Sequence, residues 1–527
     1  MDQQPPVAGE AGTDLPSPAA SARSSMRLDR RDWLILAGLL ATFALVRVTL
    51  FPFAENLYGD SVVRSELAER WANEPTLYRS FKDGVYQFGP LHFYYMGLVM
   101  KAWPSREHAT RFASLLLGLL VVVPLYRLGK RLFSRRAGVI AALGMSVWGL
   151  HVQASTTAAS EAVFLFLFFL LLDLLFRGIE EERFAPLAGA AVVANLLCAL
   201  RYDGWMYVPL FGAAVALAGK DRLASVTRAV MFLGLCAPFP LWWMQMNEKA
   251  TGDALYPIHY IDQYHARWVQ DGVAWLGGAG QRALALFFWP GAVLVTTSLL
   301  VGFFALVGVV RSLVRKERRA LALLALIPVA YYAFRGAVLL DFSPLTRFFM
   351  AQIALALFYV DSGFTAVCGT LPGGARKAVA GLTAALAVAT PAYLGWATAW
   401  KDGSPADTLR PISPLSTIPT DQMAIARHLK QVVKPGETVV IDEAPQYMDI
   451  NVAFFTGLAE PRLARRRWEN FEKQLREQPH PRWMFIARGG TLETRDGIVP
   501  GAEELRWRDE VWRKDLETRS LFVYRLP

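Results

Sequence analysis

The sequence has few cysteines and few charged residues for its length. Only three cysteines occur in 527 residues, and all of them (Cys198, Cys236 and Cys368) lie in or beside apolar segments, so no disulfide framework is expected. Charged residues make up 19% of the chain and hydrophobic residues 54%, whereas soluble domains average about 25% and about 45–50%. These values exclude a disordered chain, a disulfide-rich scaffold and a coiled coil. They predict a membrane protein that carries some soluble material.

Motifs of soluble enzymes are also missing. The chain contains no G-x-x-x-x-G-K-[ST] nucleotide loop, no H-E-x-x-H zinc motif, no C-x-x-C pair and no G-x-S-x-G turn. ATP-driven transport through a nucleotide site in this chain is therefore not expected. His259 and His265 of the stretch HYIDQYH would lie about 120° apart on a helix, which favours interfacial packing of the aromatic residues there over a metal site. No cofactor and no metal ligand is assigned, and a divalent cation is left open.

The net charge of +10 has an uneven distribution along the chain. Basic residues gather in three short loops, at 127–136, 220–228 and 311–319. With a cytoplasmic N-terminus and apolar segments that alternate across the membrane, all three loops fall on the cytoplasmic side, as the positive-inside rule requires. The positive charge is thus interpreted as a topology signal, and no nucleic-acid partner is expected.

Apolar segments predict how the chain is divided between the lipid bilayer and water. Residues 1–25 are rich in Pro, Ala, Ser and Gly and are interpreted as a disordered cytoplasmic tail. Residues 26–400 are expected to form a transmembrane module of about eleven helices, since about twenty apolar residues cross the hydrocarbon. The expected spans are 32–53, 111–127, 137–153, 161–177, 185–200, 204–219, 229–246, 288–311, 319–335, 346–367 and 376–400. The short segment 89–104 is interpreted as an interfacial helix on the outer surface, with a twelfth span as the alternative.

Three longer segments lie on the outer side in this topology: 54–110, 247–287 and 401–527. The last of them mixes charges of both signs with short apolar runs. Helices are expected at 420–433, 446–457 and 468–477, and strands at 438–443, 483–487 and 521–524. This pattern predicts a small C-terminal α/β extracytoplasmic domain. Its basic run at 462–467 is interpreted as a solvated face, with binding of an anionic glycan or headgroup as the alternative.

An acidic residue stands where the first outer segment begins. Asp60 opens the amphipathic stretch DSVVRSELAERWA shortly after the first span. Asp is favoured at the N-terminus of a helix, where it caps free N–H groups and meets the positive end of the helix dipole. A carboxylate held at the membrane surface can also serve as a general base. Position alone leaves both interpretations open.

The order of several short motifs along residues 30–365 resembles the GT-C superfamily of membrane glycosyltransferases, which use polyprenyl-phosphate sugars. The series runs from Asp60 through FGPLHFYY and RFASLL to SEAVFLFLFFLLL, LRYDG and PLTRFF. The nearest branch by resemblance is the family 39 type, which includes protein mannosyltransferases and lipid A aminoarabinose transferases. The resemblance implies a polytopic, GT-C-like fold with a glycosyltransferase site that faces outward.

The resemblance also implies roles for particular acidic and amide residues. Asp60 matches the first-loop acid that is the proposed catalytic base of the family, although Ser61 stands where the family often has a second acid. Glu161 matches a further family acid and is expected in the substrate site, where it would orient the acceptor or a metal; its place at a helix start also suits a simple dipole partner. Gln87 is expected at the substrate as well. The aminoarabinose transferases carry Lys before a Pro-Pro-Leu at this point, so their donor specificity is not carried over.

Two arginines lie at the outer edges of expected spans. A charge in that position is costly and marks function, and a guanidinium binds phosphate through two parallel hydrogen bonds. Arg347 and Arg201 are therefore expected to contact a phosphate or pyrophosphate of the substrate, with Asp203 beside Arg201. Snorkelling to headgroups, or pairing of Arg201 with Asp203, is the alternative. Arg47 and Arg335 are lesser candidates for such a contact and are interpreted mainly as snorkelling residues.

Together these observations predict an inverting glycosyltransferase that moves a sugar from a polyprenyl-phosphate donor in the lipid bilayer to a glycan, lipid or protein acceptor outside the cytoplasm. Asp60 would take the proton of the acceptor. A flippase or transporter of lipid-linked glycans, and an oligosaccharide ligase or polymerase on the same scaffold, are the alternatives. The chain has no N-x-[ST] sequon, which favours a bacterial inner membrane with the N-terminus in the cytoplasm and the C-terminal domain in the periplasm.

Overall fold

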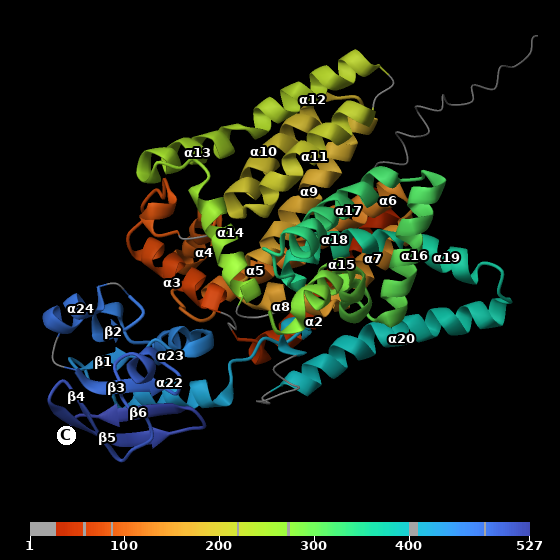
Figure 1. The fold of residues 1–527 in the computed structure, drawn as a ribbon. Coiled ribbons are helices and arrows are strands. Elements are labelled where there is room, and N and C mark those ends of the chain that lie inside the picture. The colour runs from red at the N-terminus through yellow and green to blue at the C-terminus, as the bar shows by residue number, and fades with distance from the viewer. Residues whose placement is uncertain are drawn as a thin grey trace, which may run out of the picture.

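A long helical body carries a smaller domain at one end (Figure 1). The structure, a computed structural model, describes residues 28–55, 59–85, 88–218, 221–270, 274–399, 409–468, 470–478 and 481–527. The expected tail at 1–25 lies outside these residues. The six strands of the described chain all belong to one sheet in the smaller domain. The predicted fold class, a polytopic helical membrane protein with a small C-terminal α/β domain, is confirmed.

Within the described residues, six helical stretches are long and apolar enough to cross a membrane, or up to eight if each of two bent pairs is one span. The six contain α2 (Arg30–Leu50), α5 (Ala109–Leu120) with α6 (Val122–Leu132), α9 (Ser160–Glu180), α17 (Arg319–Phe334), α18 (Met350–Ala356) with α19 (Val360–Cys368), and α20 (Gly373–Thr398). The bent pairs are α7 (Arg135–Val147) with α8 (Gly149–Thr156), and α12 (Arg222–Cys236) with α13 (Pro238–Thr251). The shorter apolar helices α10 (Phe184–Leu200) and α11 (Asp203–Ala218) bring the total close to the predicted number.

Further helices pack beside these spans. They are α3 (Gly59–Asn73), α4 (Pro90–Ala102), α14 (Tyr256–Trp268), α15 (Gly277–Thr296) and α16 (Leu299–Arg315). At 1.5 Å per residue, the 13 residues of α4 extend about 20 Å, which is less than the roughly 30 Å of hydrocarbon in a bilayer. This length argues against the alternative of a twelfth span at 89–104.

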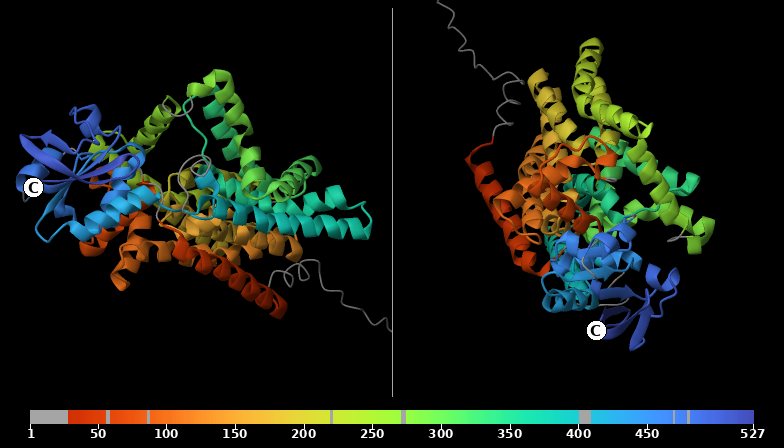
Figure 2. Two further views of the ribbon diagram at one scale, coloured as in Figure 1. Left: turned by 90° about the horizontal axis from the view of Figure 1, so that it is seen from below. Right: turned by 90° about the vertical axis from the view of Figure 1, so that its left-hand side faces the viewer.

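Helix α3 is buried on two sides. Leu67 and Ala68 belong to an apolar cluster that also holds residues of α4. Val62 belongs to another cluster, with Ile418 and Phe454 of the C-terminal domain. The helix therefore lies between the body and the domain, and Figure 2 shows the domain beside these N-terminal helices at one end of the body.

The C-terminal domain is a six-stranded sheet with helices against it. In chain order its main elements are α22 (Thr420–Val432), β1 (Thr438–Ile441), α23 (Met448–Thr456), β2 (Leu463–Arg465), α24 (Phe471–Glu477), β3 (Pro481–Ala487), α25 (Thr491–Thr494), β4 (Glu504–Trp507), β5 (Glu510–Glu517) and β6 (Leu521–Arg525). The strand order is β2-β1-β3-β6-β5-β4, with β1 parallel to β2 and β3, and with β3, β6, β5 and β4 antiparallel in turn. Val439 and Phe485 on one face of the sheet pack with the apolar side of α22.

Two expectations for this domain need correction. Strands β2, β4 and β5 were not predicted. In β5, which reads EVWRKDLE, only Trp512 is fully buried, so the sequence has no apolar run to recognise. The basic run at 462–467 is not a solvated face. The side chain of Arg465 is 5% exposed and pairs with Glu66 and Glu460, and Arg467 pairs with Asp449.

Glycines allow α16 and α19 to approach closely, and this yields a stability prediction. A Cβ added at Gly363 would lie 1.8 Å from the carbonyl oxygen of Phe304, and one added at Gly308 would lie 2.1 Å from that of Tyr359. We expect Gly363→Ala to lower the free energy of unfolding by about 1–3 kcal/mol, because the two helices must separate. Thermal unfolding of the purified protein measures this effect. The control Gly381→Ala, which has nothing within 4 Å of the new Cβ, should be neutral, and equal losses would contradict the packing account.

Candidate active site

A small pocket lies where several distant segments meet. Its charged residues come from three places: Glu161 at the start of α9, Arg201 and Asp203 where α10 ends and α11 begins, and Arg347 in a short 3-10 helix (Thr346–Phe349). The other lining residues are Phe164, Leu165, Met206, Tyr207, Tyr332, Phe348, Met350, Ala351 and Gln352. The pocket therefore combines one charged side with mostly apolar walls.

Arg201 is the centre of the charged side. The chain is extended at this residue, where α10 ends and α11 has not yet begun. Its Nη1 donates to Glu161 Oε1 at 2.7 Å and to Ser160 Oγ at 2.9 Å. Its Nε donates to Asp203 Oδ2 at 2.7 Å, and its Nη2 lies 2.6 Å from the same oxygen. The Tyr332 hydroxyl donates to Asp203 Oδ1 at 3.2 Å, so both carboxylates are fixed.

Asp60 reaches this cluster through Arg347, whose Nη1 donates to Asp60 Oδ2. Arg64 follows Asp60 by one helical turn on α3, and its Nη1 lies 3.9 Å from Glu161 Oε2. Burial raises the pKa of Asp60, but the charges of Arg347 and Arg64 lower it by more, so the pKa of this carboxyl lies below its ordinary value. While Arg347 holds it, Asp60 is a stable anion and a weak base.

The charges in the cluster balance, with three arginines and three carboxylates. The arginines differ in how fully they are engaged. All three guanidinium nitrogens of Arg201 contact carboxylates. Arg347 contacts one carboxylate oxygen, that of Asp60, and its buried Nε has no hydrogen-bond partner among the described residues. Arg347 is thus the arginine of the pocket with donor capacity left for a ligand.

The structure brings together five of the six residues that the sequence analysis placed at the site. These are Asp60, Glu161, Arg201, Asp203 and Arg347. The sixth, Gln87, lies outside the described residues. Sequence reasoning missed Arg64, Ser160 and Tyr332. Arg64 had a signal, since residues four apart share a helix face, whereas nothing in the sequence connects Tyr332 with residue 203.

The interpretation of two other arginines as snorkelling residues is wrong. Arg47 is fully buried, donates to Ser155 Oγ at 2.9 Å and lies 2.5 Å from His151 Nδ1. Arg335 pairs with Asp262 at 2.6 Å and with Asp341 at 3.0 Å. In both cases partners from distant segments satisfy the guanidinium inside the protein, so it does not extend to the headgroups.

The two histidines of HYIDQYH lie on different faces of α14, as their spacing indicated. His259 is exposed and its Nδ1 lies 2.7 Å from Asp253 Oδ2. His265 is buried against the rings of Phe342 and Phe348. Across the described ranges, no group of three or more His, Cys, Asp or Glu side chains is placed to hold a metal ion.

The fold of the chain is that of GT-C membrane glycosyltransferases, and the resemblance inferred from the sequence is confirmed. Residues 87–243 match the family model described as dolichyl-phosphate-mannose-protein mannosyltransferase. This stretch includes Glu161, Arg201 and Asp203 but is less than half of the chain. No curated protein sequence matches the chain. The spans and the shared fold make it a multi-pass membrane protein.

Three solved structures illustrate the similarity. ArnT from Cupriavidus metallidurans in the apo state is 14% identical with a TM-score of 0.57, over 93% of this chain and 97% of that one. The same protein bound to undecaprenyl phosphate is 13% identical with a TM-score of 0.56, over 94% and 98%. The archaeal oligosaccharyltransferase AglB from Archaeoglobus fulgidus, in complex with an inhibitory peptide and a dolichol-phosphate, is 14% identical with a TM-score of 0.50, over 88% and 70%. At these identities the likeness is one of fold.

The bonds of Arg201 generate a stability prediction. We expect Arg201→Met to lower the free energy of unfolding by about 3 kcal/mol, because Glu161 and Asp203 lose their closest cation inside the protein. Unfolding in lipid nanodiscs measures the loss. Arg183→Met is the control: its pair with Glu181 is exposed and 3.5 Å long, so its effect should stay within about 0.5 kcal/mol. A loss for Arg201→Met no larger than that of the control would contradict the central place of Arg201.

Proposed function

We propose that the chain is an inverting glycosyltransferase that takes a sugar from a polyprenyl-phosphate carrier and places it on an acceptor outside the cytoplasm. One observation carries the proposal: the Asp60 carboxylate is held by Arg347 at a pocket with two arginines and two carboxylates on one side and apolar walls on the other. Such a pocket suits a ligand with an anionic end and an apolar chain. The family match and the shared fold with proteins solved with undecaprenyl phosphate and dolichol-phosphate support it.

Arg347 is assigned to the donor phosphate. It has an unused buried Nε and one carboxylate partner, whereas Arg201 is fully committed to Glu161 and Asp203. A guanidinium that turns two N–H groups toward a phosphodiester forms a bidentate, charge-assisted contact. The apolar walls, which include Phe164 and Met206, would receive the first isoprenoid units of the carrier.

Binding of the donor would change the chemistry of Asp60. When Arg347 turns to the phosphate, Asp60 keeps only Arg64 as a nearby positive charge, so its pKa rises. A general base works best when its pKa is close to the pH of the reaction. Asp60 therefore becomes an effective base only after the donor has arrived, so the proton is taken from the acceptor only when the donor is bound.

The reaction proceeds by a single displacement. Asp60 takes the proton of the acceptor hydroxyl as that oxygen forms a bond to the anomeric carbon of the sugar. The bond between this carbon and the phosphate oxygen breaks on the opposite face, so the configuration is inverted. The bonding electrons leave with the polyprenyl phosphate, and Arg347 stabilises the charge that develops there. No protein acid is needed, because a phosphate is a good leaving group.

The orientation and division of the chain follow from this proposal. Residues 26–400 would form the catalytic membrane module of a bacterial inner-membrane protein, with the N-terminus in the cytoplasm. Residues 401–527 would form the periplasmic domain. The acceptor would be a glycan, a lipid or a protein that reaches the pocket from the periplasmic side.

The experiment that tests the function is a transfer assay with protein in lipid, a panel of radiolabelled polyprenyl-phosphate sugars, and an extract of membrane and periplasm as acceptor. We expect Asp60→Asn to lower the rate by about 10³-fold, since the base is removed while the side chain keeps its shape. The control is Glu74→Gln, which changes an exposed acid just beyond α3 and should leave the rate unchanged.

Two outcomes would contradict the proposal. Near-normal turnover by Asp60→Asn would show that another group is the base. Movement of labelled lipid between leaflets, without transfer from any donor, would favour the transporter alternative.

The pH dependence of the reaction tests the exchange of partners at Arg347. The acid limb of kcat/KM reports Asp60 in the free enzyme, where its pKa is depressed, and that of kcat reports the donor complex. We expect the limb of kcat to lie at higher pH than that of kcat/KM, because the donor complex lacks the Arg347–Asp60 attraction. Arg347→Gln should move the limb of kcat/KM upward and close the gap. Coincident limbs in the wild type would contradict the exchange.

A further inference from the structure

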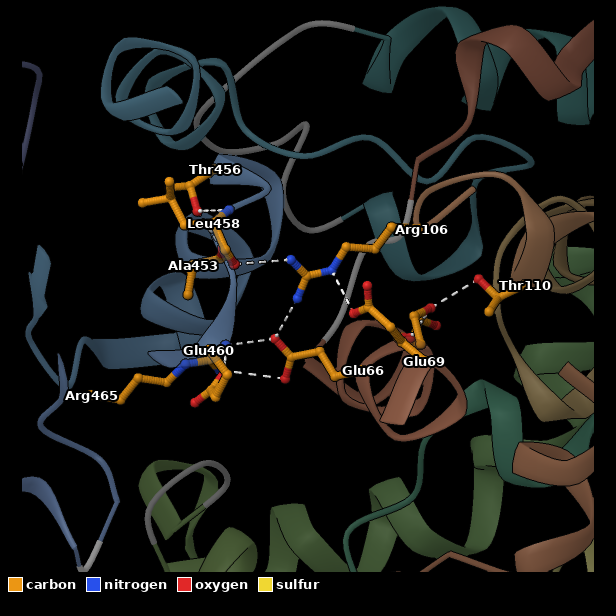
Figure 3. Close-up of polar contacts among 11 residues, drawn as sticks. Glu66, Glu69, Arg106, Thr110, Ala453, Thr456, Leu458, Glu460 and Arg465 are labelled. Carbon is orange, nitrogen blue, oxygen red and sulfur yellow. Dashed lines mark hydrogen bonds and ion pairs between the residues drawn. The ribbon is translucent and has the colours of Figure 1, made fainter. Parts of the chain in front are cut away.

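A second cluster of charges lies where α3 meets the C-terminal domain (Figure 3). Arg465, the last residue of β2, donates from Nη2 to Glu66 Oε1 of α3 at 2.8 Å and to Glu460 Oε2 at 2.9 Å. Its Nη1 donates to the other oxygen of Glu66 at 3.4 Å. The side chain of Arg465 is 5% exposed, so this two-point contact is largely shielded from water.

Arg106 holds the same helix from another direction. It lies between α4 and α5, and its Nη2 is 3.5 Å from Glu66 while its Nε is 3.1 Å from Glu69. Its Nη1 donates to the carbonyl oxygen of Leu458, and its guanidinium lies 4.7 Å from the ring centre of Phe454. Both of these partners belong to the C-terminal domain. The two arginines therefore connect the acidic side of α3 with that domain.

The acidic side of α3 is not the side that carries Asp60. Glu66 follows Asp60 by six residues, which places it about 120° around the helix and about 9 Å along it. Asp60 and Arg64 point to the pocket cluster, while Glu66 points to the C-terminal domain. A rotation or a shift of α3 would thus change the Glu66 contact and the Asp60–Arg347 contact together.

We infer that Arg465 is a positioning residue for the proposed glycosyltransferase site: through Glu66 it sets the rotation and depth of α3, and thereby the place of Asp60. The apolar contacts of Val62 with Ile418 pack α3 against the domain but do not fix its position along its own axis. The two-point contact of a planar guanidinium with a carboxylate fixes direction as well. The C-terminal domain then contributes to catalysis although none of its residues lines the pocket. The inference rests on the proposed function.

Transfer kinetics test the inference with a matched control. Arg465→Gln and Glu66→Gln are each expected to lower kcat by about 10- to 100-fold, because small displacements of a catalytic group are costly, with KM for the donor nearly unchanged. The double variant should be no worse than either single one, as for two residues that act through one contact. Arg465→Lys keeps the charge but loses the two-point contact with Glu66, so its rate should lie between those of Arg465→Gln and the wild type. The control Arg466→Gln removes a pair with Asp496 inside the domain and should keep the wild-type kcat.

A structural readout separates positioning from general loss of stability. Backbone amides of 59–73 should exchange with deuterium at least about tenfold faster in Arg465→Gln than in the wild type, while exchange in the C-terminal domain stays unchanged. Unchanged kcat in Arg465→Gln, or an equal loss in Arg466→Gln, would overturn the inference while Asp60→Asn still tests the function. Absence of transfer by the wild type would overturn both.

Discussion

The ion pair between Asp60 and Arg347 joins two parts of the chain that are far apart in sequence, helix α3 and the short 3-10 helix Thr346–Phe349. Both charges are partly withdrawn from water, with 25% and 30% of the side chains exposed, so each is stabilised by the other. The other charged residues of the site, Arg64, Glu161, Arg201 and Asp203, lie around this ion pair. In the proposed mechanism an anionic ligand competes with Asp60 for Arg347, and this exchange would turn Asp60 from a held anion into a base.

The other charges of the site divide into fixed and exchangeable contacts. Arg201 has partners at every nitrogen and holds Glu161 and Asp203 in place, which gives the pocket a rigid side. Helix α3 is fixed in turn by the C-terminal domain, through Arg465 and the apolar contacts of Val62. In this account the membrane module supplies the phosphate contact and the apolar walls. The C-terminal domain would hold Asp60, the proposed base, in position.

The sequence was sufficient for features that depend on local patterns. Long apolar runs predicted the spans and short apolar runs predicted strands such as 483–487, because burial demands apolar side chains over the length of each element. The order of the motifs selected five residues that the structure brings together: Asp60, Glu161, Arg201, Asp203 and Arg347. Pairing partners were out of reach: Arg47 with Ser155, or Arg335 with Asp262, joins segments whose proximity depends on the whole fold. The charged strand β5 was missed for a related reason, since its pairing with β6 and not its composition makes it a strand.

The binding of polyprenyl phosphate without a sugar tests the central claim most directly, because it needs no acceptor and no turnover. The dissociation constant is measured for the wild type, Asp60→Asn and Arg347→Gln in the same detergent. If Asp60 and the phosphate compete for Arg347, Asp60→Asn binds the lipid about tenfold more tightly than the wild type, and Arg347→Gln binds it more weakly. Unchanged or weaker binding by Asp60→Asn would contradict the exchange on which the account depends.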